Sequence, residues 1–196
     1  MQAECLANGP TGQTNWNAID WQEQNRLVRN LRQRIFRATQ EANWRQVRSL
    51  QRLMLRSRAN VLLSVRRVTQ VNQGKNTPGV DKVTIKTPTE RGKLADDLLA
   101  DTPWRAKPAR RVYIPKANNA KLRPLGIPVI RDRALQAMLK NVLEPSWEAR
   151  FEGSSYGFRP GRGCHDAIGK IYQLCRPTTR KKWILDADIQ GAFDNI

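Results

Sequence analysis

This sequence has few acidic residues. It also lacks long apolar runs and a signal-peptide core. Its 196 residues hold 17 Asp and Glu against 35 Lys and Arg, so the formal net charge is +18. No run approaches the roughly 20 apolar residues of a membrane-spanning helix, and the first residues lack the pattern of a secretory signal. A positive surplus of this size favours a polyanionic partner, so we expect nucleic acid and no membrane association.

Cysteine and histidine are also scarce. Cys5, Cys164 and Cys175 show no CxxC spacing, which excludes a zinc ribbon and gives no disulfide framework. The pair Cys164-His165 permits a nucleophile, or a metal site with Cys175, but reduced thiols in an intracellular protein are the simpler interpretation. Because His165 is the only histidine, metal chemistry here has to depend on carboxylates.

Two helices are predicted in the N-terminal half. Asp20 followed by Glu23 indicates a helix start with a pair resembling a capping box. A second helix is predicted to begin near Asn43 and Trp44. Its apolar stripe continues at helical spacing to Val65, so the pattern predicts one helix over this stretch.

Arginine without neighbouring acid distinguishes these helices. Residues 24–40 and 42–80 contain no Asp or Glu, and no lysine precedes Lys75. A solvated helix face normally mixes both signs of charge, so phosphate binding explains this composition better than solvation does. Arginine also binds phosphate bidentately and stacks on bases. The RNA contacts predicted here are Arg26, Arg29, Arg34, Arg37, Arg45, Arg48, Arg52, Arg56, Arg66, Arg67 and Lys75.

The middle of the chain combines helices with a hairpin. A short helix is predicted around residues 94–99. It carries Asp96-Asp97, a poor metal pair because adjacent helical positions point about 100° apart; we expect both to be solvated. Residues 110–128 indicate a β-hairpin with its turn at Asn118-Asn119, and a helix is predicted from about Asp132 to Trp147.

A glycine-rich turn and an acidic strand are predicted next. In the turn, SSYGFRPGRGCHDAI, Arg159 and Arg162 are expected to be exposed beside aromatic residues, as suits a nucleic-acid strand. The stretch KWILDADI alternates as a strand does and places Asp186 and Asp188 on one face, roughly 6 to 7 Å apart. Such carboxylates need a partner. Either Mg²⁺ or one of the many arginines satisfies this need, and the composition leaves both possibilities open.

The order of these motifs resembles that of the group II intron-encoded reverse transcriptases, also called maturases. The matching segments are KNTPGVDKVTI, YIPKANNAKLRPLGIP, RDRALQAM, SSYGFRPGRGCHDAI and DADIQGAFDNI, and the resemblance runs from about Trp21 to Ile196. It implies an α+β fold: the fingers of a right-hand polymerase with basic N-terminal helices, and the first palm strand. It also implies intron RNA, a DNA target or primer strand and dNTP as partners.

Individual roles follow from the resemblance. Asp188 matches the catalytic metal ligand, with the carbonyl of Ile189 joining the same Mg²⁺ shell. Lys116 and Arg123 match the basic pair that binds the dNTP, and Phe193 matches the residue that stacks under its sugar and rejects a 2′-hydroxyl. Asp186 matches no catalytic role, and Asp194 matches a helix cap.

The predicted divisions are a flexible segment over 1–19, a basic helical extension over 20–92, fingers and upper palm over 93–181, and the first palm strand over 182–196. No Tyr-x-Asp-Asp tetrapeptide occurs in the sequence. In this family that turn supplies further metal ligands, so we expect this chain by itself to be inactive. The function expected is an RNA-dependent DNA polymerase and maturase in the cytoplasm. A non-catalytic RNA-binding module is the alternative, and a generic DNA-binding protein explains the charge but not the hairpin or Asp188.

Overall fold

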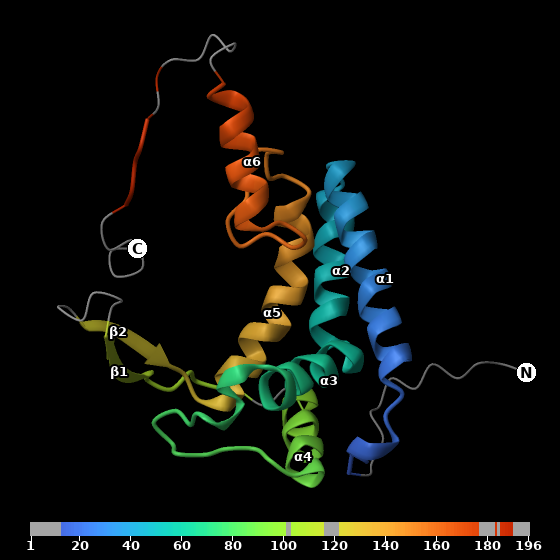
Figure 1. The fold of residues 1–196 in the computed structure, drawn as a ribbon. Helices are drawn as coiled ribbons and strands as arrows, with labels where there is room; N and C mark the ends of the chain where they lie inside the picture. The colour runs from blue at the N-terminus through green and yellow to red at the C-terminus, as the bar shows by residue number, and fades with distance from the viewer. Residues whose placement is uncertain (1–12, 101–102, 116–121, 177–182, 184, 190–196) are drawn as a thin grey trace, which may run out of the picture. The chain divides into compact units, whose positions relative to one another are not determined.

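The computed structural model describes residues 13–100, 103–115, 122–176, 183 and 185–189. Within these residues the protein has six α-helices and one two-stranded antiparallel sheet, an α+β arrangement (Figure 1). The elements are η1 (Trp16–Ala18), α1 (Trp21–Gln40), α2 (Trp44–Arg56), α3 (Arg58–Arg66), η2 (Arg67–Val71), η3 (Gln73–Asn76), α4 (Pro88–Leu99), β1 (Arg110–Pro115), β2 (Leu122–Ile127), α5 (Ile130–Glu148) and α6 (Cys164–Leu174). The chain divides into two compact units, residues 1–150 and 151–196.

The predicted helix starts are confirmed by their caps. The Asp20 carboxylate accepts hydrogen bonds from the backbone N–H groups of Gln22 and Glu23 at the start of α1. The Asn43 side chain accepts one from the Gln46 N–H at the start of α2. Each cap satisfies a backbone donor that has no partner within the helix.

The single second helix predicted from the apolar stripe is wrong, because Ser57 interrupts it. Ser57 is extended, with ψ at 122°, and α3 begins one residue later. The break is invisible to the periodicity, since Met54, Val61 and Val65 remain at helical spacing across it. What differs is burial: α2 buries one stripe, whereas α3 is buried on most sides.

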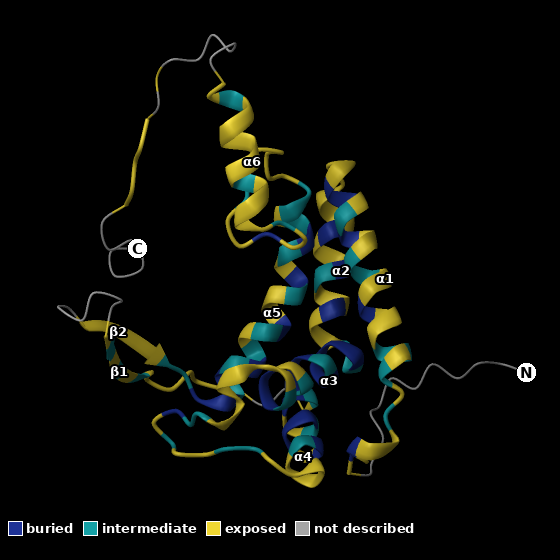
Figure 2. Ribbon diagram, in the orientation of Figure 1, coloured by how far each residue is buried: buried dark blue, intermediate teal, exposed yellow. Residues whose placement is uncertain are grey.

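Helix α3 is the centre of the first unit. It contacts α1, α2, α4 and α5, and the ribbon of its buried residues is coloured dark blue in Figure 2. Two apolar clusters meet there. One joins η1, α3, α4 and α5 around Val61, Leu62 and Val65, and the other joins α1, α2 and α5 around Ile35 and Met54. The α1 and α5 surfaces that define the candidate site are therefore held by a shared core.

The hairpin prediction is also confirmed. Strands β1 and β2 pair antiparallel, with Val112 opposite Leu125 and Ile114 opposite Arg123. Pro124 lies within β2, which is compatible with a strand that has a pairing partner on one side only. The predicted turn at Asn118-Asn119 lies outside the described residues.

The second unit contains the glycine-rich turn and α6. No strand is assigned over residues 185–189, and all five are exposed, with Ile189 at 76% of its full accessibility. The predicted acidic strand is therefore not formed by the described residues of this segment, 183 and 185–189. A strand requires a hydrogen-bonded neighbour, and no described residue pairs with this segment. None of the helices among the described residues has the length and apolarity needed to cross a bilayer.

Candidate nucleic-acid interface

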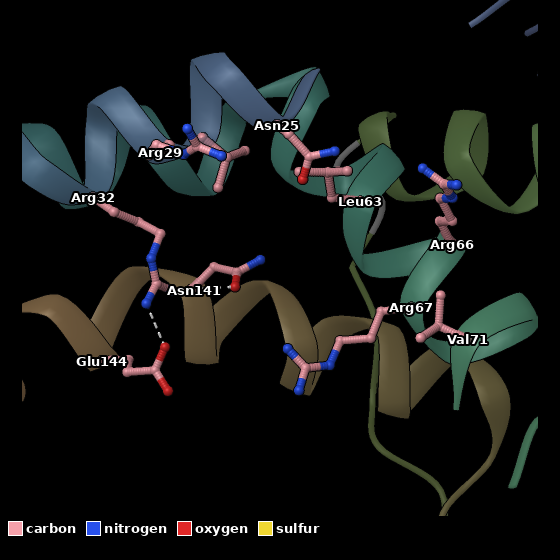
Figure 3. Close-up of a pocket in the computed structure, with 10 residues that line it drawn as sticks. Asn25, Arg29, Arg32, Leu63, Arg66, Arg67, Val71, Asn141 and Glu144 are labelled. Atoms are coloured by element: carbon pink, nitrogen blue, oxygen red, sulfur yellow. Dashed lines mark hydrogen bonds and ion pairs between the residues drawn. The ribbon is translucent and has the colours of Figure 1, made fainter. Parts of the chain in front are cut away.

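A groove of about 440 Å³ lies on the first unit, lined by α1, α3, η2 and α5. Four arginines line it, Arg29, Arg32, Arg66 and Arg67, and Glu144 is the single acid among its lining residues. Figure 3 shows these side chains arranged around the groove. The lining carries a net charge of +3 if all five groups are ionised, as expected at neutral pH.

Glu144, the only acid among the residues that line the groove, already forms ion pairs. The Nη2 atom of Arg32 on α1 lies 2.5 Å from Oε2 of Glu144 on α5, and the Nζ atom of Lys140 lies 3.4 Å from Oε1. In Figure 3 Arg32 and Glu144 point toward one another across the groove. Burial of Glu144 raises its pKa, but the hydrogen bond and charge of Arg32, with Lys140, outweigh burial and leave the pKa below its usual value.

Arg32 is further positioned by a polar chain from the core. Its Nη1 atom donates to Oδ1 of Asn141 at 3.4 Å. The Asn141 amide in turn donates to Oδ1 of Asn60 at 2.8 Å. Asn60 is fully buried, and its own amide donates to the carbonyls of Met54 and Met138. The side of the groove formed by α5 is thus connected to the interior by satisfied hydrogen bonds.

The remaining arginines of the groove have different surroundings. Arg66 stacks on the Trp21 ring, with its guanidinium carbon 4.4 Å from the ring centroid. Arg29 and Arg67 are exposed, and neither has an ion pair among the described residues. Two uncompensated guanidinium groups beside the Arg32–Glu144 ion pair form a site that suits phosphate oxygens.

The other arginines predicted to contact RNA lie elsewhere on the helices. Arg26 is paired with Glu23, at 2.7 Å, and Arg37 lines a second groove, of about 320 Å³, together with Arg29 and Arg32. The Lys75 ammonium donates to the Gln70 carbonyl at 3.1 Å. The remaining predicted contacts are exposed on helix surfaces and line neither groove: Arg34, Arg45, Arg48, Arg52 and Arg56.

Arg159 corrects one prediction. It was expected to be exposed, yet only 8% of it is accessible, and its Nη1 atom donates to the carbonyls of Glu152 and Ser155 at 2.6 and 2.9 Å. Arg162 is half-buried and donates to the carbonyls of Gly153 and Ser155 at 2.5 and 3.0 Å. Both guanidinium groups satisfy carbonyls of an irregular loop, which lacks the backbone pairing of a helix or strand.

The residues predicted for polymerase chemistry lie in both compact units or outside the described residues. Arg123 is exposed on β2, and Asp188 and Ile189 are exposed in an extended segment. Lys116 and Phe193 lie outside the described residues. No three His, Cys, Asp or Glu side chains of the described residues gather where they could hold a metal. Asp188 and Ile189 offer the hard oxygen ligands that Mg²⁺ prefers, but only a partial set.

Two acidic residues have structural roles that the sequence pattern did not indicate. Asp96, expected to be solvated, is half-buried and accepts hydrogen bonds from the backbone N–H and the hydroxyl of Thr14. Asp132 was seen only as a helix start, but it is buried and binds Trp104 and Lys107. The one available sequence signal for this role of Asp132 was its charge, because it lies among apolar helix positions. Cys164 and Cys175 are free and exposed.

Comparison with known proteins gives consistent matches. The model for the N-terminal domain of reverse transcriptase matches residues 16–98. The model for reverse transcriptase (RNA-dependent DNA polymerase) matches residues 114–196. The first model covers α1 to α3 and nearly all of α4, and the second begins within β1 and includes β2, α5 and α6.

Similar curated proteins include Protein YkfC of Escherichia coli (strain K12), 41% identical over 75% of this chain and 40% of that protein. Group II intron-encoded protein LtrA of Lactococcus lactis subsp. cremoris is 39% identical over 64% of this chain and 20% of its own length. Nuclear intron maturase 1, mitochondrial, of Arabidopsis thaliana is 35% identical over 35% of this chain and 9% of its own length. The chain thus spans less than half the length of each of these relatives.

Proposed function

Because this chain belongs to the reverse transcriptase family, among relatives encoded by group II introns and intron maturases, we propose that it forms the N-terminal and fingers part of an RNA-dependent DNA polymerase. The same protein would bind its intron RNA and assist splicing. The relatives' printed names and the two family models support this assignment.

RNA binding is assigned to the groove between α1 and α5. The observation that carries this assignment is the pair of exposed arginines Arg29 and Arg67, which form no ion pair with any residue that the structure describes and lie beside the compensated Arg32–Glu144 pair. A phosphate in the groove would gain charge-assisted hydrogen bonds without first breaking a protein ion pair. The exposed arginines of α2, Arg45, Arg48, Arg52 and Arg56, would extend the contact by non-specific attraction.

Nucleotide binding is assigned to the hairpin. Arg123 on β2 and Lys116 beyond β1 would bind the triphosphate of the dNTP, and Phe193 would lie under its sugar. The carboxylate of Asp188 and the carbonyl of Ile189 would supply part of the Mg²⁺ ligand set. When bound, the metal supplies charge neutralisation for the phosphates. The chain's own basic groups hold the nucleotide by the same electrostatic principle.

The test is primer extension by a complete reverse transcriptase that contains this chain. We expect Asp188→Asn to abolish extension on an RNA template while leaving RNA affinity unchanged. Asp186→Asn is the matched control, since it removes the same charge two positions away, from an equally exposed residue. Equal activity of the two variants would refute the assignment of Asp188.

A non-catalytic RNA-binding module is the second candidate. It is favoured by the exposed arginines Arg29 and Arg67 of the groove, which suit phosphate oxygens and require no metal site. Under this alternative the 196-residue chain binds intron RNA with full affinity and no complete protein containing it extends a primer. Extension by the complete protein decides for the enzyme.

A further inference from the structure

The first turn of α5 holds two loops through two adjacent charged residues. Asp132 is 6% exposed. Its Oδ1 atom accepts a hydrogen bond from Nε1 of Trp104 at 2.5 Å, and its Oδ2 atom accepts one from the Lys107 backbone N–H at 3.1 Å. The guanidinium of Arg131 lies over the Trp104 ring, 4.3 Å from its centroid. The segment before β1 is therefore bound to α5 through both carboxylate oxygens and an aromatic ring.

Arg133 binds the loop over residues 74–79 and the connection after β2. Its Nε atom donates to the Pro128 carbonyl at 3.0 Å, Nη1 donates to the Gly74 carbonyl at 3.0 Å, and Nη2 donates to the Thr77 carbonyl. Gly79 adds a close backbone contact, because a Cβ at this position would lie 2.7 Å from the Cα of Val129. The loop over residues 74–79 is thus held against the start of α5.

These contacts enclose the hairpin at both ends. Lys107 lies three residues before β1 begins at Arg110, and Pro128 directly follows the last residue of β2. Both connections of the hairpin are therefore bound to one helical turn. That turn is itself part of the apolar core through Ile130 and Ala134.

We propose that Asp132 and Arg133 are positioning residues for nucleotide binding. They act through the hairpin: by holding its two ends, they define where the basic residue Arg123 on β2 meets the triphosphate. This inference rests on the proposed polymerase function. Neither residue needs to touch the nucleotide, because the restraint acts on the β1 and β2 backbone.

The restraint has a kinetic signature. A less rigidly held hairpin has to be ordered when the nucleotide binds, and this entropic cost appears in binding. Contacts to the triphosphate are present before and during the reaction, so their weakening raises KM more than it lowers kcat. A residue that only stabilises the fold would not separate the two constants at temperatures well below unfolding.

The experiment uses Asp132→Asn and Trp104→Phe in a complete reverse transcriptase that contains this chain. Asparagine keeps the shape of the side chain but replaces one of the two acceptors with a donor, and phenylalanine removes the indole N–H together with its five-membered ring. We expect each variant to raise KM for dNTP about tenfold with kcat within about twofold. The double variant should raise KM no more than the more impaired single variant does, because the two substitutions remove the same single hydrogen bond. The control is Asp97→Asn, which removes the same charge from an exposed residue of α4. It should alter neither KM nor kcat.

A parallel measurement on the 196-residue chain separates this inference from the proposed function. Hydrogen exchange in residues 110–115 and 122–127 should be faster in Asp132→Asn than in the wild type, with exchange in α1 and α2 unchanged. Unchanged exchange in the hairpin would overturn the inference, as would an unchanged KM or a fall in kcat alone. If the complete wild-type protein fails to polymerise, the proposed function is lost, and the role in nucleotide positioning is lost with it. Faster hairpin exchange in the variant would then show that Asp132 anchors the hairpin in a protein with another function.

Discussion

The groove between α1 and α5 makes a quantitative prediction for the salt dependence of RNA binding. We consider the double variant Arg29→Ala/Arg67→Ala, which removes the two exposed arginines of the groove that have no ion pair within the described part of the chain. Arg32 remains paired with Glu144 and contributes less. If each removed arginine neutralises one phosphate, the slope of log affinity against log salt should become shallower by about 1.4 to 1.8.

This change in slope corresponds to a large difference over an ordinary salt range. Raising the salt from 50 to 200 mM should weaken RNA binding by both proteins. The fold loss of affinity should be roughly tenfold smaller for the double variant than for the wild type. Fluorescence anisotropy with a labelled RNA hairpin measures it directly. The charge-matched control is Lys86→Ala/Lys93→Ala, which removes two exposed charges from residues that line neither groove. Identical slopes for the double variant and this control would refute the assignment of the groove to phosphate binding.

Three predictions concern the framework of the site and are measured by urea unfolding. Asn60→Leu should lower the free energy of unfolding by about 2 kcal/mol, because the buried groups that Asn60 binds lose their partner; an unchanged midpoint would contradict this. Gly79→Ala should cost about 1–3 kcal/mol, since its Cβ would meet backbone at 2.7 Å, and a neutral result would show that the loop yields there. The lowered pKa of Glu144 contributes stability that is fully present above its ordinary value of 4.5 and is lost as the pH falls through the folded pKa. Glu144→Gln should therefore reduce the acid sensitivity between pH 6 and 3, and equal sensitivity would contradict the pairing with Arg32.

Local signals accounted for much of the fold. Asp20 and Asn43 cap helices where the sequence predicted helix starts, because a cap is chemistry within four residues. The hairpin was predictable for a similar reason, since two short strands separated by a turn pair with their nearest neighbour in the chain. Ser57 was not predictable, because the apolar spacing continues through the bend.

The fate of individual charged residues depended on distant parts of the chain. Arg32 and Glu144 are 112 positions apart, and no pattern in either helix predicts that they pair. Asp96 binds Thr14 across 82 positions. Arg159 was predicted at the surface on composition, but its loop needed a donor for its carbonyls and Arg159 became buried.

By itself, the sequence determined the charge of this protein, its helix starts, its hairpin and its family, because these depend on composition, on short-range hydrogen bonding and on the order of motifs. The tertiary structure alone decided which arginines remain free. It placed α1 and α5 side by side so that Glu144 compensates Arg32 and leaves Arg29 and Arg67 uncompensated. It also gave Asp132 its two donors. The physical reason is that a guanidinium or carboxylate acquires its role from the partners that folding brings within about 3 Å, and sequence separation does not limit which partners those are.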